Sequence, residues 1–412
     1  MTSDRCRSCG ASLRFAVCDF GDQPLANRFV APDDETPEPR FPLRVMVCGT
    51  CLLVQLETVP DPSSIFGEYN YLSSVSSAWL AHGERFAAMA AARFGLDARS
   101  LVIEVGSNDG GTLRPFLAHG IRCIGIDPAA NVAEAARRAG VPTRTAFFGD
   151  AVAASLAAEG LQADLLIANN VLGHVPDLRG FARGLSRVLA RDGVLSVEVP
   201  HVLSLLRDGQ FDTIYHEHVS YFSVLSLDRL LTAAGLEIFD IETLPTHGGS
   251  LRLFIRHASG GRHAAAPALA SLIAVERDEG LDRVERYAAI GRDAARVAKA
   301  LRDFLDGECA QGRVVAAYGA AAKGTMLLNA AGAGPRDIAF VADANTLKQG
   351  RLMPGCRIPV VAPEHLRAAR PDRLLILPWN IAGEIMAATS FIGGWGGRFV
   401  IPSPALRLVD PP

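Results

Sequence analysis

The stretch that decides the fold runs from Ser100 to Gly111 and reads Ser-Leu-Val-Ile-Glu-Val-Gly-Ser-Asn-Asp-Gly-Gly. Its first half is an apolar, β-branched run, which is typical of a buried parallel strand. Strand-like segments recur at 123–127, 165–168 and 193–198, and helix-like segments lie at 132–139 and 178–189. This alternation predicts a doubly wound, Rossmann-like α/β domain. Two further strand-like runs, 237–242 and 250–256, predict an antiparallel hairpin at one edge of its sheet.

The second half of the stretch predicts a ligand-binding turn. Gly106 and Gly110 let a ligand approach the backbone, and Asp127, 17 residues after Gly110, can accept hydrogen bonds from both ribose hydroxyls. Because Asn108 stands two residues after Gly106, the dinucleotide fingerprint is absent, and the turn favours S-adenosylmethionine. A dehydrogenase and a purely structural turn remain alternatives. The predicted cofactor-binding residues, including those after the next two strands, are Glu104, Gly106, Asn108, Asp109, Gly110, Asp127, Phe147, Phe148 and Asn169.

Towards the N-terminus, four of the eight cysteines form two Cys-x-x-Cys pairs. They are Cys6, Cys9, Cys48 and Cys51. In a reducing compartment such pairs favour Zn²⁺ over disulfides, because four thiolates can surround the ion as a tetrahedron. A closed four-thiolate site leaves no position for substrate, so we expect a structural zinc. A thioredoxin-like redox pair and free buried thiols are the alternatives.

Towards the C-terminus, an amphipathic stretch from 264 to 305 predicts a connecting helix, and a second α/β unit follows it. This unit opens with Tyr318-Gly-Ala-Ala-Ala-Lys-Gly324 after a strand. Small residues at a helix N-terminus, with Lys323 beside them, make an anion site. Asp343 lies 19 residues beyond Gly324, at the end of the next strand. The pattern indicates either a ligand with a pyrophosphate or a structural turn.

A cluster of ionisable and hydroxyl groups marks a candidate active site, Tyr215-His-Glu-His-Val-Ser-Tyr-Phe222. Several titratable side chains together favour catalysis over a structural role. His216 and His218 could instead form a metal-binding pair on a strand. Other candidate polar groups stand at Tyr69, Tyr71, His174 and His247.

Composition limits the possible functions. The chain has 412 residues, with 41 Lys and Arg against 44 Asp and Glu, and 49% of its residues are hydrophobic. The resulting net charge of −3 argues against a nucleic-acid partner. No stretch is long and apolar enough for a membrane span, and the N-terminus lacks the apolar region of a signal peptide. We therefore expect a cytoplasmic, monomeric protein.

Taken together, these motifs resemble those of the zinc-containing sugar-nucleotide C-methyltransferases of deoxysugar biosynthesis. The resemblance runs in order through the cysteine pairs, Glu104–Gly110, Tyr215–Ser223, His247–Arg252 and Tyr318–Gly324. It implies a zinc-binding module (1–70), an S-adenosylmethionine-binding methyltransferase domain (71–262), a helical connector (263–305) and a Rossmann-like sugar-nucleotide-binding domain (306–412). The fold class is thus α/β with a small zinc module.

The same resemblance implies methylation of the carbon next to the ketone of a dTDP-4-keto-deoxysugar, usually C3 and sometimes C5. Such a reaction needs a base, a group that stabilises the enolate oxygen and an aligned methyl donor. We choose His218 as the base, oriented or tuned by Glu217. By resemblance, Tyr215, Tyr69 and His174 line the sugar pocket. The expected substrate-binding residues are Tyr71, His247, Tyr318, Lys323 and Asp343.

Three rival functions remain. A nucleotide-dependent oxidoreductase would use the same folds, a C-methyltransferase could act on a ketone that is not a sugar nucleotide, and a non-catalytic binding protein would not need the Tyr-His-Glu-His cluster.

Overall fold

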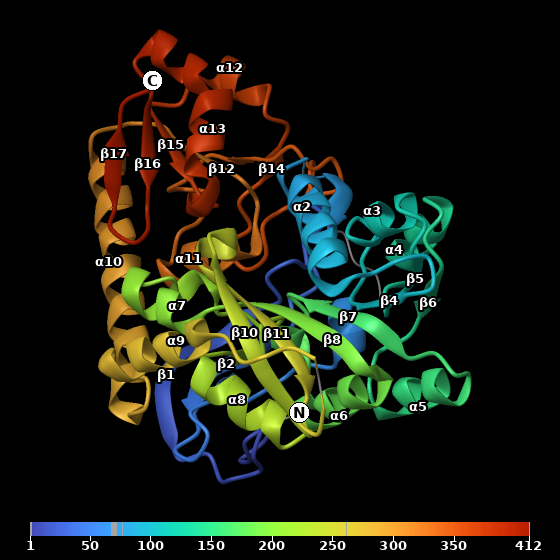
Figure 1. Cartoon of the computed structure of the whole chain (residues 1–412). Coiled ribbons are helices and arrows are strands. Elements are labelled where there is room, and N and C mark those ends of the chain that lie inside the picture. The colour runs from blue at the N-terminus through green and yellow to red at the C-terminus, as the bar shows by residue number, and fades with distance from the viewer. Residues whose placement is uncertain (1, 67–71, 76, 261, 412) are drawn as a thin grey trace.

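A computed structural model describes residues 2–66, 72–75, 77–260 and 262–411. Three β-sheets organise these residues: an N-terminal sheet, a central sheet and a C-terminal sheet. In Figure 1 the C-terminal sheet lies above the central sheet, and helix α10 runs down one side of the molecule towards strand β1 of the N-terminal sheet.

The central sheet has seven strands in the order β10-β11-β8-β7-β4-β5-β6. Their bounds are β4 Leu101–Val105, β5 Arg122–Asp127, β6 Thr143–Thr145, β7 Ala163–Asn169, β8 Leu189–Pro200, β10 Leu236–Leu244 and β11 Ser250–His257. Strands β4 to β8 pair in parallel, and β11 pairs antiparallel with both β8 and β10. The predicted doubly wound fold and its edge hairpin are confirmed.

Helices cover both faces of the central sheet because neighbouring strand residues point to opposite sides. On one face α2, α3 and α4 pack around Val102 and Leu165, and on the other α5, α6 and α8 pack around Ile103 and Leu166. The bounds of the helices and 3₁₀ turns of this part are η1 Ser73–Val75, α2 Ser77–Phe94, α3 Leu113–Ala118, α4 Ala130–Arg138, α5 Asp150–Ala158, η2 Leu172–His174, α6 Leu178–Val188, α7 Val202–Asp208, η3 Phe211–Thr213, α8 Val224–Thr232 and η4 Thr246–Gly248.

The N-terminal sheet has four antiparallel strands in the order β1-β2-β3-β9. Their bounds are β1 Phe15–Pro24, β2 Arg40–Val47, β3 Val54–Leu56 and β9 Ser220–Tyr221, with helix α1 at Pro62–Phe66. Strand β9 comes from the segment that we assigned to the methyltransferase domain. Apolar residues of β2 and β3 also share one core with α7 and α10. The predicted boundary at residue 70 therefore stays a prediction.

The connector differs from the single helix that we expected. It consists of α9 (Pro267–Asp278), the 3₁₀ turn η5 (Val284–Ala288) and α10 (Ala289–Ala310), which continues past the predicted end at 305. Gly280 ends the first helix with a φ of 81°, a conformation that glycine adopts without strain. No helix in the described ranges has the length and apolar character needed to cross a membrane.

The C-terminal sheet has six strands in the order β14-β13-β12-β15-β16-β17, parallel except for β17. The strand bounds are β12 Val315–Tyr318, β13 Val341–Ala342, β14 Val360–Val361, β15 Arg373–Ile376, β16 Arg398–Ile401 and β17 Arg407–Val409. The helix and 3₁₀ bounds are α11 Ala322–Ala330, α12 His365–Ala369, η6 Trp379–Ile381, α13 Ala382–Ala388 and η7 Ser390–Trp395. This arrangement confirms the predicted second α/β unit.

A wholly buried carboxylate, Glu276, fastens α9 to the methyltransferase domain. One of its oxygens accepts hydrogen bonds from His201 Nε2 (2.7 Å) and Val224 N (2.6 Å), and the other accepts one from Leu225 N (3.0 Å). The two backbone donors open helix α8, where a carboxylate is favoured by unpaired N–H groups and by the helix dipole. Glu276 thus joins the connector, the end of β8 and the start of α8.

We expect Glu276→Gln to lower the free energy of unfolding by about 2 kcal/mol, because the new amide N–H group would face one of the donors that the carboxylate now accepts. Urea unfolding followed by circular dichroism measures this change. Glu285→Gln is the control, since Glu285 is exposed on the same connector, and its effect should stay within about 0.5 kcal/mol. If the two variants were equally stable, the hydrogen bonds of Glu276 would not be what holds α9 to the methyltransferase domain.

Candidate active site

The two Cys-x-x-Cys pairs, one before β1 and one between β2 and β3, come together beside the N-terminal sheet. The Sγ atoms of Cys6, Cys9, Cys48 and Cys51 all lie within 4.8 Å of one another. Cys6 and Cys51 are 3.4 Å apart and Cys9 and Cys48 are 3.5 Å apart, and no cysteine forms a disulfide. Four thiols at such distances fit tetrahedral Zn²⁺ and leave no open ligand position. The predicted structural zinc site is therefore confirmed as a cluster.

One cavity of about 1230 Å³ lies at the carboxyl end of the central sheet and reaches the C-terminal domain. Seven of the nine predicted cofactor-binding residues line it: Glu104, Gly106, Asn108, Asp127, Phe147, Phe148 and Asn169. The other two, Asp109 and Gly110, do not line the cavity. Asp109 accepts hydrogen bonds from Ser73 and Ser74 and so holds turn η1 against the loop after β4.

The loop after β4 needs glycine at its first position. Gly106 has a φ of 69°, and a Cβ there would lie 3.1 Å from the side chain of Val171. Asp127 accepts hydrogen bonds from Asn108 N and Ala129 N, each of 2.9 Å, which fixes its carboxylate at the end of β5. Each carboxylate oxygen keeps a further acceptor site for a ribose hydroxyl.

Several buried oxygens at this loop lack a hydrogen-bond partner among the described residues, and they include Glu104 Oε2 and Asn169 Oδ1. Burial, with added repulsion from Asp127 and Asp109, raises the pKa of Glu104 to about 8. Unpaired buried polar atoms are costly and call for a ligand that forms hydrogen bonds with them. S-adenosylmethionine, with its ribose hydroxyls and amino group, can form such hydrogen bonds, so these residues fit it.

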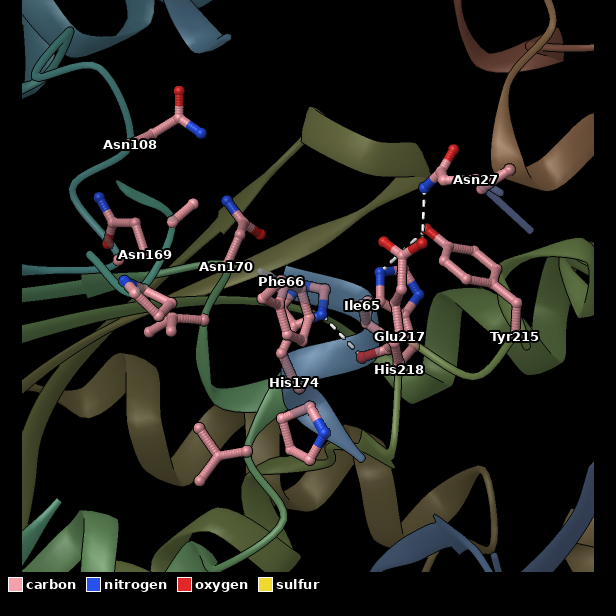
Figure 2. A pocket seen from close by; sticks show the side chains of 18 of the residues that line it. Asn27, Ile65, Phe66, Asn108, Asn169, Asn170, His174, Tyr215, Glu217 and His218 are labelled. Carbon is pink, nitrogen blue, oxygen red and sulfur yellow. Dashed lines mark hydrogen bonds between the residues drawn. The ribbon is translucent and has the colours of Figure 1, made fainter. Parts of the chain in front are cut away.

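Three residues of the Tyr-His-Glu-His block, Tyr215, Glu217 and His218, face the same cavity, as Figure 2 shows, with His174 between them and Asn169. His218 Nδ1 lies 2.7 Å from the Thr213 carbonyl, to which it can only donate a hydrogen bond, so Nε2 carries the free lone pair. Nε2 faces the Tyr215 hydroxyl at 3.1 Å. Burial and the neighbouring His174 hold the pKa of His218 well below its usual value. His218 is therefore a neutral imidazole that lines the cavity and whose unprotonated Nε2 accepts from the Tyr215 hydroxyl in the resting protein, an arrangement that suits a general base.

The predicted partner of His218 proves different. Glu217 does not orient the imidazole: its carboxylate accepts a hydrogen bond from Asn27 Nδ2 (2.6 Å), and the Thr213 carbonyl takes the orienting role. Burial raises the pKa of Glu217 to about 7. The Glu217 carbonyl accepts a hydrogen bond from His174 Nδ1 (2.7 Å), and the two imidazole rings of His174 and His218 lie 5.0 Å apart.

His216 turns to the other side of the block. Its Nε2 bonds to the Phe41 carbonyl at 3.1 Å, and it does not line the cavity. The cysteine cluster is the metal-binding group found among the described residues, so the alternative of a His216–His218 metal pair receives no support. The predicted residues Tyr69 and Tyr71 lie outside the described residues.

The predicted substrate-binding residues divide into two groups. His247 and Lys323 line the cavity, whereas Tyr318 and Asp343 do not. Asp343 accepts a hydrogen bond from Ala320 N (2.6 Å) and holds the turn after β12. Several polar residues that also line the cavity were not predicted: Asn27, Gln210, Asn345, Lys348 and Arg351. They belong to no recognisable motif, and three separate segments bring them together only in the folded chain.

Three family models match the chain in order. A zinc binding domain matches residues 6–66, a methyltransferase domain matches residues 79–241 and a C-methyltransferase C-terminal domain matches residues 245–404. A curated relative, the C-methyltransferase NovU of Streptomyces niveus, is 39% identical over 408 residues, which is 99% of this chain and 97% of that protein.

Two solved structures resemble less than half of the chain. Magnesium protoporphyrin IX methyltransferase (ChlM) of Synechocystis PCC 6803 with bound SAH is 17% identical over 43% of this chain and 83% of its own, with a TM-score of 0.35. The CcbJ methyltransferase of Streptomyces caelestis is 14% identical over 48% of this chain and 100% of its own, also with a TM-score of 0.35. These partial likenesses carry no conclusion about ligands.

The cysteine cluster predicts about one zinc ion per chain, measured by inductively coupled plasma mass spectrometry. Cys51→Ser should lose most of this zinc and unfold at a lower temperature, because Cys6, Cys48 and Cys51 belong to the core beneath the N-terminal sheet. Cys309→Ser, at an exposed cysteine, is the matched control and should keep the metal. A full zinc content in Cys51→Ser would show that the four cysteines do not form the zinc site.

Proposed function

The chain belongs to a family of C-methyltransferases that combine a zinc-binding, a methyltransferase and a C-terminal domain, and from this premise we propose that it methylates a dTDP-4-keto-deoxysugar beside its ketone. The proposed position is C3. S-adenosylmethionine-dependent C-methyl transfer is the activity of the family, and the sugar nucleotide is our proposal. One observation carries it: a single cavity brings together the loop after β4, the Tyr-His-Glu-His block and two lysines of the C-terminal domain.

The methyl donor belongs at the end of the cavity formed by the loop after β4. Asp127 is fixed to accept from the ribose, and Asn169 offers an unpaired acceptor for the amino acid portion. Phe147, whose side chain is 52% exposed, can cover the adenine. When bound, S-adenosylmethionine supplies a methyl group on a sulfonium centre, which a carbon nucleophile attacks.

The nucleophile forms at the other end of the cavity. We assign His218 Nε2 as the base that takes the proton from the carbon beside the ketone, leaving the electron pair of that C–H bond in an enolate. The Thr213 carbonyl then stabilises the imidazolium through Nδ1–H. The Tyr215 hydroxyl, which donates to His218 Nε2 in the resting protein, is the group placed to turn its O–H to the enolate oxygen. His174, whose Nδ1 donates to the Glu217 carbonyl, lines the same part of the cavity.

The distribution of lysines supports an anionic substrate. The chain has only three lysines, since arginine provides nearly all its other cations, and two of the three line the cavity, Lys323 and Lys348. The Nζ atom of Lys323 is buried without a hydrogen-bond partner among the described residues, and that of Lys348 donates to the Ala320 carbonyl (2.8 Å). Compact ammonium groups bind phosphates well, which supports a nucleoside diphosphate in this part of the cavity.

We expect the enzyme to exchange the proton beside the ketone of a dTDP-4-keto-6-deoxysugar for deuterium in D₂O. His218→Ala should slow this exchange by at least about 100-fold, because it removes the general base. Mass spectrometry follows the exchange and, with S-adenosylmethionine present, the gain of a methyl group. His119→Ala, at an exposed histidine outside the cavity, should leave both rates unchanged.

The pH dependence gives the same experiment a second readout. Because the pKa of His218 is lowered, the base stays unprotonated as the pH falls through 6.5, and exchange should remain near its maximum there. If the wild type binds S-adenosylmethionine yet neither exchanges nor methylates the sugar nucleotide, the acceptor is wrong, and a ketone that is not a sugar nucleotide takes its place. Turnover of a nicotinamide cofactor would favour an oxidoreductase instead.

Lys348→Met should weaken the binding of dTDP by about 10- to 100-fold, because it keeps the aliphatic stem but removes a charge-assisted contact to phosphate. Isothermal titration calorimetry measures the affinity. Lys299→Met is the matched control, since Lys299 is the third lysine and lies exposed on α10, paired with Asp303. Equal dTDP affinity in the two variants would count against a nucleotide at this place.

A further inference from the structure

A buried polar cluster joins the C-terminal domain to the turn that precedes the Tyr-His-Glu-His block. Asp212, which is 1% exposed, lies in turn η3, and its Oδ2 accepts a hydrogen bond from Trp379 Nε1 at 2.6 Å. Trp379 belongs to η6, directly after strand β15 of the C-terminal sheet. Lys323, at the start of α11, places its Nζ 4.6 Å from the centre of the Trp379 ring. Three elements of the chain therefore meet at one buried carboxylate.

The charges of this cluster act on each other without a direct hydrogen bond. Asp212 Oδ1 and Lys323 Nζ are both buried and have no hydrogen-bond partner among the described residues. Burial raises the pKa of Asp212 and the charge of Lys323 opposes this, while burial lowers the pKa of Lys323 and the charge of Asp212 opposes that. Each group thus favours the charged form of the other, and the indole N–H fixes the position of the carboxylate.

The residue after Asp212 orients the base. The Thr213 carbonyl accepts from His218 Nδ1, and Thr213 Oγ1 donates to the Gln210 carbonyl (2.8 Å), which keeps the turn closed. Gln210 Nε2 in turn donates to the Gly248 carbonyl (2.7 Å) in the loop of His247. If the Thr213 carbonyl moved away, the proton of neutral His218 could occupy Nε2, which would then have no lone pair for the substrate.

We propose that Asp212 and Trp379 are positioning residues: they hold turn η3 so that the Thr213 carbonyl keeps the His218 proton on Nδ1 and leaves Nε2 free as the base. The C-terminal domain thereby controls the base as well as binding substrate. This inference rests on the proposed function of His218 but concerns the resting protein. Lys323, which lines the cavity, then has a second role, because its positive charge favours the charged form of the Asp212 carboxylate.

The direct test is the tautomer of His218, read from the ¹⁵N chemical shifts of histidine-labelled protein without any ligand. The His218 signals are assigned by their loss in His218→Ala. We expect an unprotonated Nε2 in the wild type, and signal from an Nε2-protonated form in both Trp379→Phe and Asp212→Asn. Trp379→Phe removes the N–H donor but keeps a ring, and Asp212→Asn keeps an acceptor but removes the charge.

Trp395→Phe is the matched control. Trp395 also lies in the C-terminal domain, but it donates its indole N–H to the Pro371 carbonyl (3.0 Å) of the same domain and not to turn η3. It should leave the tautomer unchanged. With the sugar nucleotide, both test variants should lower the maximal rate of proton exchange by about tenfold or more, with a change in KM of less than about threefold.

An unchanged His218 tautomer in either folded test variant overturns the proposal, as does an equal shift in Trp395→Phe. If Trp379→Phe fails to fold, the isosteric Asp212→Asn decides alone. Failure of the proposed function would appear differently: the wild type would not exchange the substrate proton at all, while the tautomer measurement would still decide whether Asp212 and Trp379 position His218.

Discussion

The backbone of Val219, directly after the Tyr-His-Glu-His block, is the point on which the site depends. Its carbonyl accepts a hydrogen bond from Leu56 N (3.0 Å) of the N-terminal sheet, and its N–H donates to the Gly173 carbonyl (2.7 Å) of turn η2. Strand β9 then completes the zinc-bearing sheet. His218 and His174 are neighbours because the hydrogen bond between Val219 N and the Gly173 carbonyl joins the residues that directly adjoin them in the chain. The zinc cluster lies outside the cavity, yet the sheet that it stabilises sets the position of the base.

Burial gives the cavity its electrostatic character. It lowers the pKa of His218 and His174 and raises the pKa of Glu217 and Glu104, so all four groups are driven towards their neutral forms. Neutral walls suit a reaction in which charge develops on the substrate, because fixed donors and acceptors then act in a poorly screened space. The two lysines supply positive charge where the C-terminal domain meets the cavity.

Local sequence predicted most of the fold and much of the site. The strands of the central sheet other than the short β6, the edge hairpin, the cysteine cluster and the Tyr-His-Glu-His block follow from runs of residues that need no tertiary information. Strand β9 could not be predicted, since two residues carry no periodicity and their pairing depends on β3. The Thr213 carbonyl was missed because a backbone acceptor has no signature in sequence. Asp212 and Lys348 belong to no sequence motif, and their partners, Trp379 and the Ala320 carbonyl, come from segments that are distant in sequence.

The β3–β9 pairing also has a consequence for how the chain is made. About 160 residues separate Leu56 from Ser220, so the ribosome needs about ten to thirty seconds to deliver the last strand of the N-terminal sheet after the first three have emerged. During that interval the edge of β3, fully buried in the finished protein, has no partner. All four cysteines precede β3, so zinc bound by them would already hold the nascent strands together while β9 is still being made.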